Sequence, residues 1–336
     1  MVDFLHTIKS GIFGLAIGDA LGVPAEFMKR EELDVNPVMG MSDGGIHCQP
    51  KGTWSDDTSM TLCLMESIVN TLGIHTNDIM DRFVEWIDDA AYTATGDVFD
   101  CGHTVAQAIF RYKDGTPAAL CGGNKPNCNG NGSLMRILPM AYALYPKYGT
   151  DLTKYGRTME LVHKVSGLTH RHPLSQAVCG IYVNIATRLI DGEGIFDAIS
   201  DAVERSICWY GRHERFYDID EPLSGIADIV ALKGRKRNDI QSGGYVIDTM
   251  EAALWCLLNT DSYRDCVLTA VNLGEDADTV AAVTGGLAGI FYEYESIPKD
   301  WIDVLASKEM IEKSCMKMAE YMKRELIVYG GKNVNR

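Results

Sequence analysis

Two short segments of the chain, more than 200 residues apart, place carboxylates beside hydroxyls. The first acidic segment is Ser55-Asp56-Asp57-Thr58 and the second is Asp276-Ala277-Asp278-Thr279, and an apolar helical pattern follows each. Hard divalent cations such as Mg²⁺ and Mn²⁺ need several oxygen ligands, and a carboxylate pair beside a hydroxyl supplies them from very little chain. The two segments together predict a metal site divided between distant parts of the chain.

Either acidic segment alone also fits an ordinary helix start. Ser, Thr and Asp are preferred there because they accept hydrogen bonds from free amides and complement the helix dipole. Capping does not explain why both segments carry two carboxylates with a threonine directly after. Nor does it explain a third acidic residue, Glu26, which follows the Gly-rich segment 18–22, where we expect a turn.

Five segments resemble, in the same order, the motifs of the ADP-ribosylglycohydrolase family, which includes the dinitrogenase reductase-activating glycohydrolases. The resemblance runs from about residue 8 to about residue 305, and five matches in order are far more specific than one. The segments are 14–22, 52–58, 130–136, 243–249 and 272–279.

The two acidic segments would bring four carboxylates and two hydroxyls around one volume. Two cations about 3.5–4 Å apart would neutralise that charge better than one. The resemblance implies the same pair of Mg²⁺ or Mn²⁺ ions, and a position where the family usually has glycine is Glu275 here. The implied ligands are Ser55, Asp56 and Asp57 on one ion, Asp276 and Thr279 on the other, and Asp278 between them.

Two further acidic residues are catalytic candidates. Taken alone, Glu26 fits a solvated turn residue and Asp100 fits a helix N-cap. The resemblance implies instead that Glu26 lies beside the metal pair, where it binds one ion or transfers protons. It also implies that Asp100 lies near the reacting ribose, although the adjoining Cys101 replaces a usual aliphatic residue.

A Gly/Asn loop that includes residues 122–124 and 129–133 is expected to expose backbone amides. A helix predicted for 133–145 would add aligned N–H groups and a dipole that favours an anion. Beside a divalent metal the loop predicts a phosphorylated substrate, and the resemblance assigns it to the diphosphate of ADP-ribose. The predicted substrate-binding residues are Gly130, Asn131, Gly132 and Ser133, with His170 implied by the resemblance as a wall of the same pocket.

Histidines and aromatic residues add less specific signals. His170 and His172 are two residues apart and do not share a helix face, and Pro173 is expected to start the next helix, so zinc binding by the pair is not predicted. Four aromatic residues are candidates for stacking on adenine, and the sequence does not choose among them: Tyr92, Tyr210, Phe216 and Tyr217.

Composition narrows the class of protein. The net charge of −15 argues against a nucleic-acid surface, and the short basic stretch 233–237 fits a solvated loop. We find no apolar stretch of the roughly 18 residues that a membrane span requires, and no secretory signal pattern. Ten cysteines without a Cys-x-x-Cys pair fit reduced thiols. We therefore expect a cytoplasmic protein without a membrane partner. The sequence does not indicate whether the protein is a monomer or an oligomer.

Apolar residues recur at three- and four-residue spacing almost throughout, which predicts an all-α fold. No linker composition sets a boundary, so we expect one compact domain over 1–336. Interior glycines in the helix predicted for 277–294 indicate close packing against a neighbouring backbone. The polar stretches 114–132 and 209–221 are expected to be functional loops, and the extent 298–326 to contain a helix break.

These features predict a metal-dependent hydrolase that removes ADP-ribose from a modified protein side chain or small molecule by cleavage at C1″. Two alternatives stay open. One is a metal-dependent phosphoesterase acting on a nucleotide diphosphate, and the other is a catalytically silent ADP-ribose-binding protein. The acceptor has no signature in the sequence, since arginine, serine, a nucleobase and O-acetyl-ADP-ribose would present the same ADP-ribosyl half.

Overall fold

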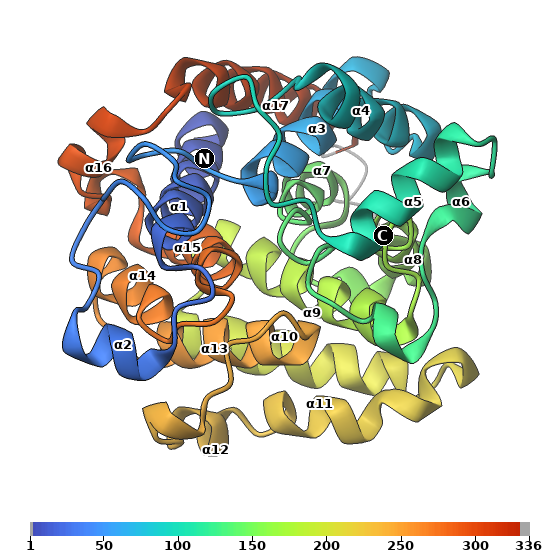
Figure 1. The fold of residues 1–336 in the computed structure, drawn as a ribbon. Coiled ribbons are helices and arrows are strands. Elements are labelled where there is room, and N and C mark those ends of the chain that lie inside the picture. Colours follow the sequence, from blue (N-terminus) through green and yellow to red (C-terminus); the bar gives the residue numbers. More distant parts are fainter. Residues whose placement is uncertain (1–2, 330–336) are drawn as a thin grey trace.

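A computed structural model describes residues 3–329, and the described chain is helical without a β-sheet (Figure 1). Only isolated β-bridges occur within this range. The α-helices are α1 (Phe4–Gly22), α2 (Arg30–Val35), α3 (Asp56–Thr71), α4 (Thr76–Asp89), α5 (His103–Lys113), α6 (Ala118–Cys121), α7 (Pro139–Tyr148), α8 (Gly156–Ser166), α9 (Pro173–Ile190), α10 (Ile195–Tyr210), α11 (Asp220–Ala227), α12 (Ile229–Lys233), α13 (Val246–Asn259), α14 (Tyr263–Val271), α15 (Ala277–Tyr292), α16 (Lys299–Val304) and α17 (Lys308–Tyr329). Short 3₁₀ helices are η1 (Val23–Ala25), η2 (Pro126–Cys128), η3 (Leu152–Lys154), η4 (Glu214–Ile219), η5 (Arg237–Asp239) and η6 (Tyr294–Ser296).

The all-α prediction is confirmed, and so is the break within 298–326, which separates α16 from α17. Asp228 separates α11 from α12, because its carboxylate accepts the amide of Ala231 and so caps α12. Helix α4 begins at Thr76, with His75 at the N-cap.

Two corrections concern the site directly. The Gly-rich segment 18–22 is not a turn but the last part of α1. The helix predicted to follow Ser133 begins six residues later, at Pro139. Residues 131–136 form tight turns instead, in which the amides of Leu134 and Met135 both donate to the carbonyl of Asn131.

The predicted close packing of α15 is confirmed, and its partner is α1. The two helices lie side by side in Figure 1 although they come from opposite ends of the chain. A Cβ added at Gly14 would lie 2.3 Å from the carbonyl oxygen of Gly285, and one added at Gly18 would lie 2.1 Å from that of Ala281. Any side chain at these glycines would push the helices apart. The glycines therefore set the distance between the two helices.

A continuous hydrophobic cluster extends from Phe4 in α1 to Met322 in α17. One helical stretch, Phe4–Ala25, is long and apolar enough to cross a membrane by length and composition, which corrects the expectation that no stretch reaches that length. However, 89% of the apolar 18-residue stretch within this segment is buried inside the protein. The core position of α1 accounts for its apolar character.

Candidate active site

Three carboxylates meet where the end of α1 approaches the starts of α3 and α15. They belong to Asp19, Asp57 and Asp278, whose oxygen atoms lie within 4.8 Å of one another. All three side chains are fully buried. The tight contact of α1 with α15 produces this meeting, since a Cβ at Gly22 would lie 2.2 Å from the Cα of Asp278.

Asp19 is a member of this cluster that the sequence analysis did not single out. Its Oδ1 accepts the amide of Ser55 at 2.9 Å, and its Oδ2 accepts the amide and the hydroxyl of Thr58 at 3.1 and 2.6 Å. Asp19 therefore caps α3 from another helix and fixes the first acidic segment against α1. Burial raises the pKa of Asp19 to about 6, an effect that these hydrogen bonds oppose. The sequence signal that could have identified Asp19 was a single carboxylate inside a mainly apolar helix.

The other two carboxylates carry unused acceptor atoms. Within the described chain, Oδ1 of Asp57 and both carboxylate oxygens of Asp278 are buried without a hydrogen-bond partner. The second oxygen of Asp57 accepts the hydroxyls of Ser55 and Thr279 at 3.1 and 3.3 Å. Burial raises the pKa of Asp57 and of Asp278 well above the usual value, and neighbouring carboxylates add to the effect.

Such buried, unpaired carboxylates are costly unless a cation compensates them. The donor set consists of carboxylate and hydroxyl oxygens, which suits a hard divalent ion. The residues present therefore fit a metal ion, and the predicted proximity of the two acidic segments is observed. Residues 55–58 and 276–279 are joined directly by the Thr279–Asp57 hydrogen bond.

A second acidic group lies nearer the surface. The carboxylates of Glu26 and Asp100 and the ring of His47 have ligand atoms within 4.8 Å of one another. The Nε2 atom of His47 lies 2.5 Å from a carboxylate oxygen of Glu26, and the His47 ring packs against Phe99. His47 was missed by the sequence analysis because it lies in a loop without a recognisable pattern.

The environment of Glu26 favours its protonated form. The residue is 5% exposed, so the solvated turn position that its sequence alone suggested does not occur. Burial raises its pKa to about 9, with the charges of Asp100 and Asp276 adding to the effect. Burial likewise raises the pKa of Asp100 and, well above the usual value, that of Asp56.

The Gly/Asn loop at 129–133 is attached to the second acidic segment. The side-chain amide of Asn131 donates to Asp276 Oδ2 at 2.8 Å and to the Thr249 hydroxyl at 2.9 Å. The amide of Asn131 donates to the carbonyl of Gly244, so the loop pairs with residues 243–246 as well. These contacts bring three of the predicted motifs to one place.

Glu275 adopts a left-handed backbone, with φ of +59°. Its amide donates to Met28 and its carbonyl accepts from Phe27, which ties the second acidic segment to the segment after Glu26. Left-handed backbone costs a residue with a side chain roughly 1–2 kcal/mol more than glycine. The position thus requires the conformation for which glycine is usual, and Glu275 adopts it.

A cavity of about 260 Å³ opens onto these groups. Four of the five predicted substrate-binding residues line it, namely Gly130, Asn131, Gly132 and His170. The fifth, Ser133, is fully buried, and its hydroxyl contacts Ser166 and Cys179 in the core. The acidic residues that line the cavity are Glu26, Asp56, Asp100 and Asp276, together with Thr279.

The loop lacks the helix N-terminus that was predicted to support an anion. Because α7 starts only at Pro139, its free amides do not follow Ser133, and any anion contact comes from the turns at 130–136. His170 is buried and hydrogen-bonded to the Thr169 hydroxyl through Nδ1 at 2.9 Å. Burial lowers its pKa to about 3, so the ring is neutral. His172 instead caps α9, which starts at Pro173 as predicted.

The aromatic candidates lie elsewhere. Tyr210 and Phe216 are buried in a ring cluster with His163 and Trp209. Within residues 3–329, the lining of the acidic cavity includes none of the four candidates, Tyr92, Tyr210, Phe216 and Tyr217. The aromatic residue that does line it is Phe27, which follows Glu26 directly and is 59% exposed.

Comparison with known proteins supports the same assignment as the geometry. A model of the ADP-ribosylglycohydrolase family matches residues 2–327. The chain is 36% identical over 310 residues to ADP-ribosylarginine hydrolase Tri1 of Serratia proteamaculans, covering 92% of this chain and 78% of that one. It is 32% identical over 308 residues to ADP-ribosyl-[dinitrogen reductase] glycohydrolase of Rhodospirillum rubrum, covering 90% and 92%.

A solved structure, an ADP-ribosylglycohydrolase-related protein complex, matches with a TM-score of 0.72 and 27% sequence identity, over 95% of this chain and 99% of that chain. The family model, the relatives and the structural match agree with the order of motifs and with the buried acidic cluster. The chain therefore belongs to the ADP-ribosylglycohydrolase family, whose members are hydrolases of a glycosyl bond.

Proposed function

We propose that this protein is a metal-dependent hydrolase that releases ADP-ribose by cleaving the bond at C1″ of a modified protein side chain or small molecule. One observation carries the proposal. Buried carboxylate oxygens of Asp57 and Asp278 lack partners in the described chain, and Thr279, which donates to Asp57, lines a cavity that the Gly/Asn loop also lines. Cation-binding and anion-binding groups thus converge on one place.

Two Mg²⁺ or Mn²⁺ ions are the cofactors that the acidic residues support. Bound there, the ions would supply positive charge to polarise a water molecule and the ribose hydroxyls. The proposed ligands are those that the resemblance implied. Asp19 holds the first acidic segment in position by accepting hydrogen bonds from Ser55 and Thr58. The residues proposed to hold the two ions are Ser55, Asp56, Asp57, Asp276, Asp278 and Thr279.

Glu26 and Asp100 are the proposed proton-transfer residues. A carboxyl whose pKa is raised, as that of Glu26 is, holds a proton at neutral pH and can donate it to the departing acceptor atom. His47 fixes the carboxyl of Glu26 through its Nε2 atom. A carboxylate oxygen of Asp100 lies within 4.8 Å of the ligand atoms of Glu26 and His47, and Asp100 lines the same cavity as Glu26.

The diphosphate is proposed to lie along Gly130, Asn131 and Gly132, with neutral His170 beside it. A Cβ at Gly132 would lie 2.9 Å from Cε1 of His170, so a side chain at that position would clash with the His170 ring in the cavity wall. Asn131 already donates to Asp276, and it therefore couples the loop to the acidic residues. Ser133 contributes through the core contacts that hold the loop.

The substrate, the domain and the location are inferred at a coarser level. ADP-ribosylarginine is the first acceptor to test, because the two relatives above 30% identity described here are named for arginine or dinitrogen reductase. A single domain over 1–336 is supported by the continuous core. A cytoplasmic location is supported by the ten cysteines, all of them free thiols.

The decisive experiment offers defined substrates to the purified protein with Mg²⁺, with Mn²⁺ and with chelator. The panel contains ADP-ribosylated arginine and serine peptides, O-acetyl-ADP-ribose and ADP-ribose itself. We expect free ADP-ribose as the product, and only when metal is present. Release of AMP would instead support a phosphoesterase, whereas ADP-ribose binding without turnover of any substrate would support a silent binder.

A further inference from the structure

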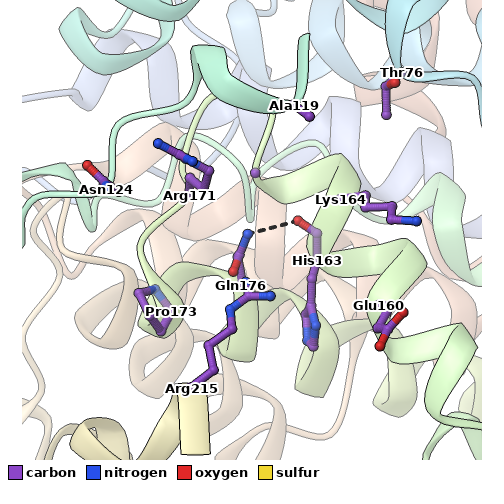
Figure 2. A pocket seen from close by; sticks show the side chains of 11 residues that line it. Thr76, Ala119, Asn124, Glu160, His163, Lys164, Arg171, Pro173, Gln176 and Arg215 are labelled. Carbon is purple, nitrogen blue, oxygen red and sulfur yellow. Dashed lines mark hydrogen bonds between the residues drawn. The ribbon is translucent and has the colours of Figure 1, made fainter. Parts of the chain in front are cut away.

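A second, larger cavity of about 840 Å³ lies between the start of α4, α6, α8, the start of α9 and η4 (Figure 2). Its volume falls in the range of about 300–1,000 Å³ that is usual for small-molecule sites. None of the residues that line it lines the acidic cavity. The proposed hydrolysis makes no use of this space.

Three cations surround the cavity, in a chain whose net charge is −15. They are Lys164 on α8, Arg171 before α9 and Arg215 in η4, and within residues 3–329 none of them forms an ion pair. Other arginines of the chain, such as Arg188 and Arg235, pair with carboxylates. The opposing acidic residue at the cavity is Glu160, which leaves a formal charge of +2 from three cations and one carboxylate.

Polar atoms at the cavity also lack partners. Gln176 is 3% exposed, and its amide nitrogen donates to the carbonyl of His163 at 3.1 Å, the dashed contact in Figure 2. This bond fixes the side chain and leaves Oε1 buried without a partner in the described residues. The Nε atom of Arg171 is likewise buried, with no hydrogen-bond partner among the described residues. A ligand that satisfied both atoms would offer one hydrogen-bond donor, to Gln176, and one acceptor, to Arg171.

The larger cavity (the basic cavity) and the acidic cavity adjoin the same chain segment but share no lining residue. His170 lines the acidic cavity, and the next residue, Arg171, lines the basic one. The segment is held in place by Gly123, whose amide donates to Thr169 at 2.9 Å and whose carbonyl accepts from Arg171 at 2.7 Å. The two cavities are therefore separate sites.

We propose that the basic cavity binds a small organic phosphate of about mononucleotide size. The phosphate group lies between Lys164, Arg171 and Arg215, and a hydroxyl or amino group of the ligand donates to Gln176 Oε1. A phosphate monoester carries a charge of about −1.5 to −2 at neutral pH, which matches the excess of +2, and arginine binds its oxygens in a bidentate manner. This proposal does not depend on the proposed hydrolysis.

The test is titration calorimetry of the full-length protein with AMP, and with adenosine as the neutral counterpart. We expect AMP to bind and adenosine to bind far more weakly. Arg215→Gln and Lys164→Gln each remove a charge-assisted contact, so each is expected to weaken AMP binding roughly tenfold or more.

Two further variants make the result specific. Glu160→Gln removes the opposing carboxylate and is expected to strengthen AMP binding. Arg212→Gln, at an exposed arginine on the same segment that does not line this cavity, is expected to leave it unchanged. Equal affinity of the wild type, Arg215→Gln and Lys164→Gln would overturn the proposal. An equal loss with Arg212→Gln would do the same, since it would indicate nonspecific attraction.

Discussion

The two cavities manage unpaired charge in opposite ways. The acidic cavity adjoins carboxylates that are wholly removed from solvent, whereas Lys164 and Arg215 at the basic cavity are exposed residues and Arg171 has its Nε atom buried without a partner in the described chain. Long cationic side chains can bury their stems and leave the charge in water, but the short side chain of aspartate cannot. Without a cation, burial of the acidic cluster therefore costs more free energy than the basic cavity costs without a ligand.

Burial of the acidic cluster has an energetic cost. Desolvation of a carboxylate favours its neutral form, and several like charges within a few ångströms add to that preference. Without a metal, the acidic cluster thus opposes folding at neutral pH, and the core compensates. The following predictions examine this contrast, from the largest expected effect to the smallest.

The first prediction concerns Asp278, the residue with two unpaired buried oxygens. Asp278→Asn removes the charge and retains the shape, so turnover should fall by roughly 10³-fold or more because metal charge stabilisation is lost. In chelator, the same variant should be at least as stable as the wild type, since the cost of burying or protonating that carboxylate has been removed. Rate assays and denaturant unfolding in EDTA measure the two effects.

Asp300 supplies the matched control, because it also occupies the first turn of a helix but is exposed. Asp300→Asn should change neither rate nor metal-free stability appreciably. A marked loss of metal-free stability in Asp278→Asn would show that the carboxylate supports the fold on its own. The contrast between the two cavities would then fail.

The second prediction concerns Glu26. Glu26→Gln keeps the size of the side chain but cannot transfer a proton, so kcat should fall by about 10²–10⁴-fold with ADP-ribose binding largely retained. Glu31→Gln, at an exposed residue of α2, is the control. Restoration of activity by excess metal would assign Glu26 to metal binding, and wild-type kinetics would remove it from the site.

The third prediction is a pH dependence of the metal-free protein. The pKa of Asp19 is raised to about 6 and that of Glu26 to about 9, so at these two groups the folded state binds more protons than the unfolded state above about pH 4. The free energy of unfolding should therefore fall as pH rises from about 7 towards 9, where Glu26 loses its proton; below about pH 6.5, buried His170, whose pKa is lowered to about 3, contributes the opposite slope. Denaturant unfolding in EDTA at several pH values measures this fall.

Added Mg²⁺ should reverse the trend, because a cation stabilises the ionised carboxylates and binds better as they lose protons. Metal-free stability that rises between pH 7 and 9 would contradict the prediction. So would an absence of any effect of Mg²⁺ at pH 8.

The smallest expected effect is ligand protection at the acidic cavity. Free ADP-ribose should inhibit turnover competitively and raise the melting temperature by mass action, adding about 2.7 kcal/mol at a hundredfold excess over Kd. Ribose should do far less because it lacks the diphosphate. Calorimetry that gives equal affinity for ADP-ribose and ribose would remove the loop 130–132 from phosphate binding.

The proximity of the two acidic segments was predictable because the relevant signal was local. Paired carboxylates beside hydroxyls are visible in the chain, and the structure brings Asp57 and Asp278 together as expected. Asp19 and His47 were missed because their roles arise from tertiary contacts, an aspartate in an apolar helix and a histidine in a loop. The basic cavity was missed for the same reason, since Lys164, Arg171 and Arg215 belong to three different elements.

The fold was predictable to a similar degree. Helical periodicity gave the all-α class, and interior glycines correctly indicated the close packing of α15. The start of α7 was wrong because an apolar pattern over 133–138 belongs to buried turns as readily as to a helix. The adenine-stacking candidates include Tyr210 and Phe216, which are core residues, because a sequence does not distinguish a buried ring from a binding ring.

The contact between α1 and α15 also constrains how the protein is made. Because α1 emerges first during synthesis and α15 only after about residue 290, α1 lacks its main partner for most of translation. Contacts of such high sequence separation slow folding and leave apolar surface exposed meanwhile. The acidic cluster forms only when both ends of the chain have met. A truncated chain should therefore have no hydrolytic site, even where its remaining helices are folded.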